Sequence, residues 1–391
     1  MAFLQFSQTE WKLIKKVVLI STAACLLVVT GTWTFFKVQM QRKIAMEKEK
    51  SNPNNSRTVI PLDIEAHRKI ADRYLQTGAP EKAVEHLERV HALDKKNTTV
   101  TLELAHAALE AGIYQKALTL YDQLLEKNGT DSSNAPQCAR RGIALFYLNR
   151  VDQSEEALLE CVKRFPDNAE AYCFLGQIEA SRGLPSEKAV NYFNRSIAID
   201  STYSEAWYQL ARVYMLQKLY PKARELLLKA VSINPFHSKS HSRLGMVYYY
   251  LDYPELAKKS YQTALILNPD DFNTHYNLGE LLYGIIGDTI AAVQEFKQAL
   301  ALNPRLYEAA FKVGLICMKN GMNKEAIGYF EQALKESPDD VRILLQCAVA
   351  WEKISRFDRA RKLYQSVLSV DELNSVARQK LKLLDQKAAV D

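Results

Sequence analysis

The 391-residue chain lacks every short motif by which catalytic and nucleotide-binding sites are commonly recognised. It has neither a G-x-x-x-x-G-K-[ST] nor a G-x-G-x-x-G loop for phosphate groups, no H-E-x-x-H zinc site and no G-x-S-x-G nucleophile turn. We therefore expect no enzymatic activity, no catalytic residue, no metal site and no cofactor. Two alternatives stay open, which are an enzyme without a recognisable motif and a non-catalytic regulatory subunit of a membrane enzyme.

Paired cysteines are also absent. The six cysteines form no C-x-x-C pair and follow no regular spacing, which argues against a zinc site or a disulfide framework. We expect them to be small buried apolar residues. They are Cys25, Cys138, Cys161, Cys173, Cys317 and Cys347.

An excess of positive charge is missing from most of the chain. Residues 1–57 contain nine Lys or Arg against three Glu, which accounts for the whole net charge of +6 and leaves 42 basic and 42 acidic residues elsewhere. A nucleic-acid-binding protein concentrates Lys and Arg on its folded domain. The sequence therefore predicts no nucleic-acid partner.

One long stretch has no charge of either sign. The run VVLISTAACLLVVTGTWTFF covers residues 17–36, and twenty helical residues span the roughly 30 Å hydrocarbon core of a bilayer. Basic residues flank the run on both sides, and Trp11 and Trp33 suit the headgroup region. We predict a transmembrane helix and a single-pass membrane protein. A cleaved signal peptide and lipidation at Cys25 are the alternatives.

The regions beside this run complete the predicted N-terminal organisation. Residues 1–16 form a tail, and residues 37–61 form a charged stalk and a linker that ends at Pro61. The side of the membrane is unresolved. Three lysines in the tail favour an N-terminus inside, which places the rest of the chain on the periplasmic or extracytoplasmic side in preference to the cytoplasmic side. The unpaired thiols argue instead for a reducing compartment.

A repeat of about 34 residues begins near Leu62. A small residue recurs every 34 to 37 residues, a second small residue follows it after twelve or thirteen, and a large apolar residue comes four residues later. The first column is Ala71, Ala105, Gly142, Gly176, Ala211, Gly245, Gly279, Gly314 and Ala348. The large column is Leu87, Tyr121, Leu158, Phe193, Leu227, Tyr261, Phe296, Phe330 and Tyr364.

Close helix packing explains the columns. Two antiparallel helices approach to about 8–10 Å only where small side chains lie at the crossing. Proline then closes a unit, because it has no N–H and a fixed φ and so does not fit inside a helix. Each unit is therefore predicted to be two amphipathic helices. The closing prolines are Pro166, Pro235, Pro269, Pro304 and Pro338.

A unit of this length with these small, aromatic and proline columns resembles the tetratricopeptide repeat. The best matches begin at Ser204 and Phe272, the second with one inserted residue, whereas the first two units lack the closing proline. The resemblance implies an all-α fold. It further implies a right-handed superhelical solenoid of about nine repeats over residues 62–374, followed by a capping helix over residues 375–391.

The resemblance also implies where a partner binds. In such solenoids the first helices of successive units line a concave groove, and residues beside the packing columns face it. Many of these residues are Tyr, Met, Phe or Arg, which are enriched at protein interfaces. The candidates are Tyr208, Gln209, Arg212, Met215, Ser242, Arg243, Met246, Tyr249, Tyr276, Asn277, Glu280, Tyr283, Phe311, Lys312 and Leu315.

Four of the residues on these helices receive specific roles. His241 and His275 occupy the column held by Trp207 in the neighbouring unit, so we expect them to serve packing and not ligand binding. Arg212 and Arg243 are expected to meet acidic groups of a partner, because a guanidinium grips a carboxylate with two hydrogen bonds. The Lys, Asn and Arg set with which some related co-chaperones hold a C-terminal carboxylate does not occur in three consecutive units.

The sequence thus predicts a membrane-anchored scaffold or adaptor that binds partner proteins or peptides in the groove, within an envelope or membrane-associated assembly. A receptor or chaperone-like docking site for transient client or precursor proteins is the alternative. Only seventeen residues follow the last unit, so we expect no appended catalytic domain. The oligomeric state is open.

Overall fold

The computed structural model describes residues 64–128, 135–183 and 187–388. Over these residues the chain folds into nineteen α-helices and one π-helical turn, and no β-strand occurs among them. The predicted all-α class is therefore confirmed. The compact unit His67–Asp391 contains nearly all of these helices.

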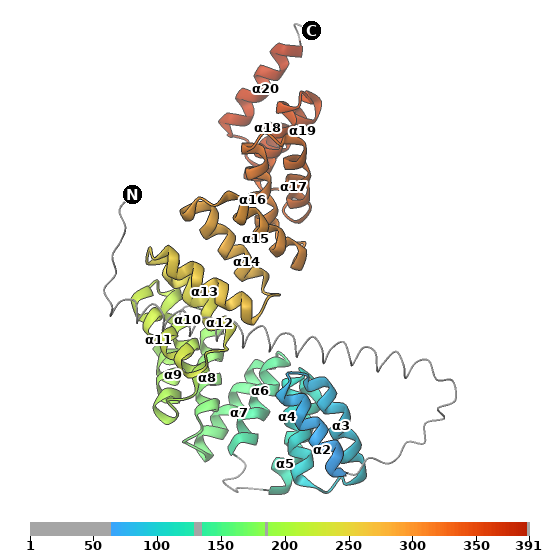
Figure 1. Ribbon diagram of the computed structural model, residues 1–391, viewed down its shortest axis with the longest axis vertical. Coiled ribbons are helices and arrows are strands. Elements are labelled where there is room, and N and C mark those ends of the chain that lie inside the picture. Colours follow the sequence, from blue (N-terminus) through green and yellow to red (C-terminus); the bar gives the residue numbers. More distant parts are fainter. Residues whose placement is uncertain (1–63, 129–134, 184–186, 389–391) are drawn as a thin grey trace, which may run out of the picture. The chain divides into compact units, whose positions relative to one another are not determined.

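The helices come in pairs joined by short turns, so that each pair corresponds to one helix-turn-helix unit (Figure 1). A last helix, α20 (Ser375–Ala388), follows the ninth pair. The pairs are α2 (Ile64–Gln76) with α3 (Pro80–Leu93), α4 (Thr98–Glu110) with α5 (Tyr114–Asn128), α6 (Ala135–Tyr147) with α7 (Val151–Arg164), α8 (Ala169–Ser181) with α9 (Glu187–Ile199), α10 (Ser204–Leu216) with α11 (Tyr220–Ile233), α12 (Ser238–Tyr250) with α13 (Pro254–Leu267), α14 (Phe272–Leu281) with α15 (Thr289–Leu302), α16 (Tyr307–Lys319) with α17 (Asn323–Glu336), and α18 (Val341–Lys353) with α19 (Phe357–Val370).

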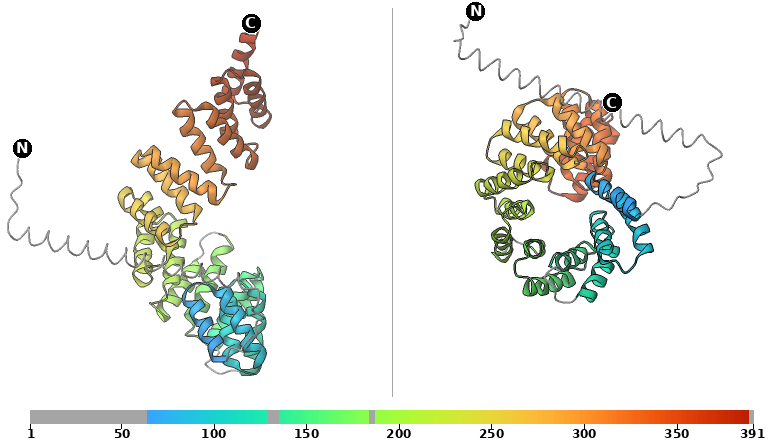
Figure 2. Two further views of the ribbon diagram at one scale, coloured as in Figure 1. Left: turned by 45° about the vertical axis from the view of Figure 1, so that its right-hand side comes forward. Right: turned by 60° about the horizontal axis from the view of Figure 1, so that its bottom comes forward.

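Contacts follow the order of the chain. From α3 to α20 each helix packs against the next one, and both views in Figure 2 show the same succession. First helices of neighbouring pairs also touch, as α12 touches α14 and α16 touches α18. In the described part of the chain, helices further apart in sequence have at most isolated contacts. This is the pattern of a repeat array, in which each unit is stabilised by its neighbours.

The predicted columns meet where the two helices of a pair cross. A Cβ atom on Gly245 would lie only 2.7 Å from Cδ1 of Tyr261, so the backbone of α12 approaches that ring directly. Every residue of the large column is at most 2% exposed. The predicted close packing is therefore confirmed. The same relation joins Gly142 with Leu158, Gly176 with Phe193, Gly279 with Phe296, and Gly314 with Phe330.

The seventh pair accommodates its inserted residue by a change of helix geometry. Thirteen residues separate Gly279 from Ala292, where the neighbouring units have twelve. A π-helical turn, η2 (Leu282–Ile286), continues α14, and its wider turn takes up one extra residue. The insertion therefore leaves the contact between Gly279 and Phe296 in place.

The five cysteines in the described residues are buried, as expected, and form no disulfide with one another. Cys138 of α6 and Cys161 of α7 lie against each other. Hydrogen bonding between the two sulfur groups lowers the pKa of Cys138, and the same interaction together with burial raises the pKa of Cys161. The sixth cysteine, Cys25, lies outside the described residues.

The predicted location in a membrane is corrected. Among the residues that the structure describes, no helix combines the length and the apolar character needed to cross a bilayer. The longest, α5, has 15 residues and four charged side chains, and it is about 22 Å long against a hydrocarbon core of roughly 30 Å. On this finding the prediction of a single-pass membrane protein is wrong. Residues 17–36, from which it was drawn, lie outside the described residues, as do 1–16 and 37–61.

Helix α20 packs on the last pair. Its residues Ala377 and Leu384 are buried in one apolar cluster with Tyr364 of α19. The Lys380 ammonium lies 3.0 Å from Glu352 Oε2, and the Tyr364 hydroxyl donates to the same oxygen over 3.0 Å. Helix α20 therefore covers apolar residues of α18 and α19 that would otherwise face water.

Candidate partner-binding groove

The predicted groove residues lie on the first helices of four successive pairs, which are α10, α12, α14 with its π-helical turn, and α16. Units repeat after 34 or 35 residues, so equivalent residues such as Tyr208, Ser242 and Tyr276 lie on neighbouring helices. Two adjoining pockets open on this surface, and together they are lined by residues of all four helices.

The first pocket lies between α10 and α12 and has a volume of about 220 Å³. Its wall includes an aromatic stack, because the rings of Tyr220 and Tyr250 lie 4.6 Å apart with an angle of 10° between them. The pocket therefore combines a cationic side with an apolar side. It is lined by Arg212, Met215, Leu216, Tyr220, Arg243, Met246 and Tyr250.

A buried glutamine orients Arg212. The Gln209 amide accepts a hydrogen bond from Arg212 Nη1 over 2.6 Å, and its Nε2 donates to Glu205 Oε1 over 2.6 Å. The Arg212 guanidinium also lies 6.0 Å from the centre of the Tyr208 ring. Gln209 itself is only 6% exposed. It was predicted to face a partner, but its amide is used within the chain, so it positions Arg212 and does not form part of the open surface.

Neither arginine of the pocket forms an ion pair in the described part of the chain. Arg243 Nη1 lies 3.9 Å from the sulfur of Met246, and Arg212 bonds only to the neutral amide of Gln209. An arginine without a carboxylate partner keeps its donors available for bidentate hydrogen bonds to an anion. The pocket therefore holds two cations that no acidic side chain of the described residues neutralises by contact.

The second pocket extends from α10 to α16 and has a volume of about 710 Å³. It shares Arg243 and Met246 with the first pocket, so the two form one continuous surface. Its lining contains charged groups of both signs, with basic groups on α12 and acidic groups before α14 and on α16. The lining residues are Tyr208, Lys239, Ser242, Arg243, Met246, Asn268, Asp271, Asn273, Tyr276, Asn277, Leu306 and Glu308.

Tyr276 of α14 lines the second pocket. Its ring contacts Phe296, with 5.6 Å between the ring centres. Burial, together with the negative charges of Glu280 and Glu308, raises the pKa of the Tyr276 hydroxyl well above its usual value. The phenol therefore stays protonated at neutral pH and can donate one hydrogen bond to a ligand.

Several other predicted residues line neither pocket, because contacts within the chain use them. The Lys312 ammonium lies 2.9 Å from Glu280 Oε2, and this pair links α16 to α14. Phe311 packs on Phe330 of α17, with 5.9 Å between the ring centres. Further members are Tyr249, whose ring meets that of Tyr250 edge-on, and Tyr283, which lies in the π-helical turn.

The aromatic column at the start of these helices has the structural role that was predicted. The indole Nε1 of Trp207 donates to the carbonyl oxygen of Ser201 over 3.0 Å. In the next two units His241 Nε2 lies 2.9 Å from the Pro235 oxygen and His275 Nε2 lies 3.0 Å from the Pro269 oxygen. Each ring thus bonds to the carbonyl six residues earlier, which is a structural contact of the kind expected for both histidines.

The structure adds pocket residues that the sequence analysis missed. Lys239, Asn273 and Glu308 lie three residues before Ser242, Tyr276 and Phe311, on the same face of each first helix one turn earlier. This spacing was available as a signal. No comparable signal marks Leu216, Tyr220 and Tyr250, because their convergence depends on how α10, α11 and α12 are placed in space.

Family models described as tetratricopeptide repeat match most of the described chain. One matches residues 74–135, 186–242 and 317–382, a second matches 139–204 and 286–341, and a third matches 238–271. Among curated proteins, anaphase-promoting complex subunit 3 of Schizosaccharomyces pombe is 20% identical over 248 residues. These residues are 61% of this chain, and the match spans only 31% of that relative.

A solved structure shows the same kind of fold. The APC/C hetero-tetramer Cut9–Hcn1 is similar with a TM-score of 0.53 and 17% identity, covering 83% of this chain and 67% of that one. YrrB, described as a TPR protein with an unusual peptide-binding site, is similar with a TM-score of 0.40 and 22% identity, covering 49% of this chain and 97% of that one. At 17% identity the likeness to Cut9–Hcn1 concerns the fold alone.

Proposed function

We propose that this chain, which belongs to the tetratricopeptide-repeat family, is a non-catalytic interaction scaffold that binds an extended segment of a partner protein across α10, α12, α14 and α16. The observation that carries the proposal is the pair of adjoining pockets. They share Arg243 and Met246 and thereby offer one continuous surface of aromatic, sulfur-containing and charged side chains. Tyr and Arg are enriched among the residues that provide most of the binding energy at protein interfaces, and Met is enriched at such interfaces.

The dimensions of this surface fit a short segment. Packed helices lie about 8–10 Å apart, so four successive first helices span roughly 25–30 Å. An extended chain rises about 3.3 Å per residue, which gives a bound segment of about eight or nine residues. The open amide and hydroxyl groups of Asn277, Asn273 and Tyr276 suit the N–H and C=O groups of such a segment.

The remaining features of the proposal concern the array as a whole. We infer that the repeats occupy residues 62–374, that residues 375–391 cap them, and that they wind into the right-handed superhelix of the family. A superhelix of this kind places the first helices on a concave face. The dissociation rate of the complex would distinguish two roles. Slow dissociation would indicate a stable assembly scaffold, and fast dissociation would indicate a docking site for transient clients.

A displayed library of random peptides tests the proposal. The full chain is immobilised and compared with a variant that carries Arg243→Ala, Met246→Ala and Tyr276→Ala, all in the two pockets. We expect the full chain to enrich a set of peptides and the variant to lose that enrichment, because the shared part of the surface is removed. Circular dichroism verifies that the variant stays helical.

A matched control removes exposed apolar side chains outside the pockets. Phe236 is 80% exposed and Ile266 is 82% exposed, and neither lines either pocket. The Phe236→Ala/Ile266→Ala variant should enrich the same peptides as the full chain. Equal enrichment by the pocket variant would mean that binding occurs elsewhere, and no enrichment by any protein would contradict the binding of short segments.

A further inference from the structure

We infer that the segment bound in the groove is acidic, and that it places a glutamate or aspartate next to a large apolar side chain in the pocket between α10 and α12. This inference rests on the proposed function, because it specifies the chemistry of the segment for which that function provides a surface. The inference is supported by two arginines that have no acidic partner among the described residues and that lie beside exposed apolar side chains of the same pocket.

The charges at this pocket are of one sign. Arg212 and Arg243 both line it, and no acidic residue does. Lys239 adds a third basic group where the second pocket adjoins the first. Glu205 lies on the same helix as Arg212, but its carboxylate accepts the hydrogen bond from Gln209 and contacts neither arginine. The carboxylates that would balance Arg212 and Arg243 are therefore supplied by the partner.

The geometry of the arginines suits carboxylate binding. Gln209 fixes Arg212 Nη1 from the buried side, which leaves the other guanidinium donors directed away from that bond. Arg243 Nη1 contacts the weakly accepting sulfur of Met246 at 3.9 Å. Replacing this contact by an anion therefore costs little favourable interaction energy. Two guanidinium groups on adjacent helices can therefore bind one or two carboxylates with forked hydrogen bonds.

The rest of the pocket is apolar and small. Leu216 is 65% exposed and Tyr250 is 54% exposed, and the side chains of Met215 and Met246 complete the wall. A volume of about 220 Å³ lies below the roughly 300–1,000 Å³ typical of pockets for drug-sized ligands. The space therefore fits one large side chain, such as Leu or Phe, and its burial removes the exposed apolar surface from water.

The other end of the groove has the opposite charge pattern. Asp271 and Glu308 line the second pocket near α14 and α16. These carboxylates repel acidic residues of a ligand, whereas the neighbouring asparagines accept a neutral main chain. The acidic residues of the segment therefore lie over α10 and α12, and its uncharged part lies towards α14 and α16.

Three fluorescent peptides, acetylated and amidated at their ends, test this chemistry. The first has glutamates on both sides of a Phe-Leu pair, the second has lysines in place of the glutamates, and the third keeps the glutamates but replaces Phe-Leu with serines. Fluorescence anisotropy with the full chain should show the first peptide binding at least about tenfold more tightly than the other two. Binding should weaken as salt is raised, because the arginines are solvent-accessible.

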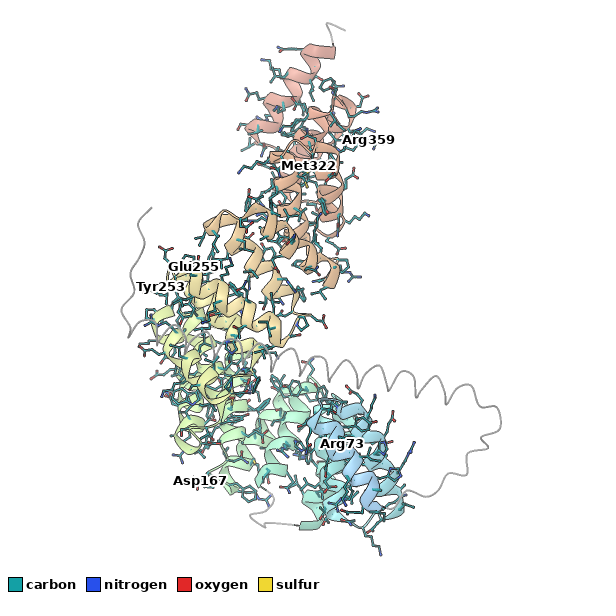
Figure 3. All side chains as sticks on the ribbon, viewed as in Figure 1. Arg73, Asp167, Tyr253, Glu255, Met322 and Arg359 are labelled. Carbon is teal, nitrogen blue, oxygen red and sulfur yellow. The ribbon has the colours of Figure 1, made fainter. Side chains whose placement is uncertain are left out.

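Two double variants carry the same change of charge. Arg212→Gln/Arg243→Gln should weaken binding of the first peptide by about tenfold per arginine, since each removes a charge-assisted hydrogen bond. The control Arg73→Gln/Arg359→Gln alters exposed residues on α2 and α19 outside both pockets (Figure 3) and should bind like the full chain.

The outcomes are distinct. Tighter binding of the lysine peptide, equal binding of all three peptides, or no effect of the pocket arginines overturns the inference. Binding only by a version of the first peptide with a free C-terminus also overturns it, because the ligand would then be a terminal carboxylate. If the displayed library shows pocket-dependent binding but the glutamate peptide does not bind, the proposed function stands and this inference fails.

Discussion

At the scale of single residues, the fold depends on pairing a glycine or alanine on one helix with a large side chain on the next. Gly245 leaves room for the ring of Tyr261, which is 2% exposed, and equivalent positions repeat this contact along the array. Where the column has alanine in place of glycine, as at Ala211, the residue is again fully buried. The size of one side chain therefore sets how closely the two helices of a unit approach.

The same substitution at two helical glycines tests this dependence. Gly245→Leu should destabilise the protein by about 1–3 kcal/mol, because the new side chain must displace the Tyr261 ring. Gly328 also lies in a helix, but nothing lies within 4 Å of a Cβ placed there. Gly328→Leu should therefore stabilise slightly, by up to about 1 kcal/mol, because leucine favours helix more than glycine does. Urea denaturation measures both, and equal effects would refute the packing argument.

At the scale of elements, seven of the units end their first helix in the same way. The second residue after the helix has a positive φ, and the N–H that follows it bonds back to a carbonyl five residues earlier, as Leu219 does to Tyr214 over 2.9 Å. This is the Schellman motif, in which the left-handed residue is usually glycine. Glycine occupies the position in some units, as Gly112 and Gly321 do. Non-glycine residues occupy it at Asn149, Lys218, Asp252 and Ser355.

Exchanging residues at this position should change stability in opposite directions. Lys218 has a φ of 59°, which an L-residue adopts at a cost of about 1–2 kcal/mol. Lys218→Gly removes this cost and adds chain entropy to the unfolded state, so we expect a net stabilisation of about 0.5–1 kcal/mol. Gly321→Ala, at a φ of 79°, should destabilise by about 1 kcal/mol. Thermal denaturation of both variants checks the expectation, which fails if the two shifts have the same sign.

At the scale of the whole molecule, each unit depends on its neighbours and not on distant units. Helix contacts in the described residues connect adjacent elements, and α20 covers the end of the α18–α19 pair. Stability in such an array is a sum of local terms, so damage at one end need not unfold the other. The groove on α10 to α16 and the helix α20 are therefore expected to respond separately to substitution.

Two adjacent leucines on α20 allow this separation to be measured. Leu384 is 3% exposed, and Leu384→Ala should destabilise the last units by about 2–4 kcal/mol by leaving a cavity in their cluster. Leu383 is 46% exposed, and Leu383→Ala should have little effect. Hydrogen exchange should show faster opening of α18 to α20 in the first variant alone, with α10 to α16 unchanged. Faster exchange throughout the chain would contradict independent units.

The groove could be located from the sequence only in part. Spacing placed the candidates on the first helices of four successive units, and the two pockets there are lined by Tyr208, Arg212, Arg243 and Tyr276 among others. It did not show that Gln209 is buried, because that depends on the chain of hydrogen bonds from Glu205 to Arg212. The membrane location was inferred from residues 17–36 alone, and no helix of the described residues supports it.

The sequence by itself determined the repeat length, the small and large columns and the helix-turn-helix unit, because these depend on spacing along one or two adjacent helices. The sequence also contains the one inserted residue of the seventh unit, which the π-helical turn η2 takes up. Only the tertiary structure decided which groove side chains are free, because Lys312 and Glu280 neutralise each other across two helices while Arg212 and Arg243 find no such partner in the described chain. Ion pairing and burial depend on distances between helices, and residue spacing in the sequence does not contain those distances.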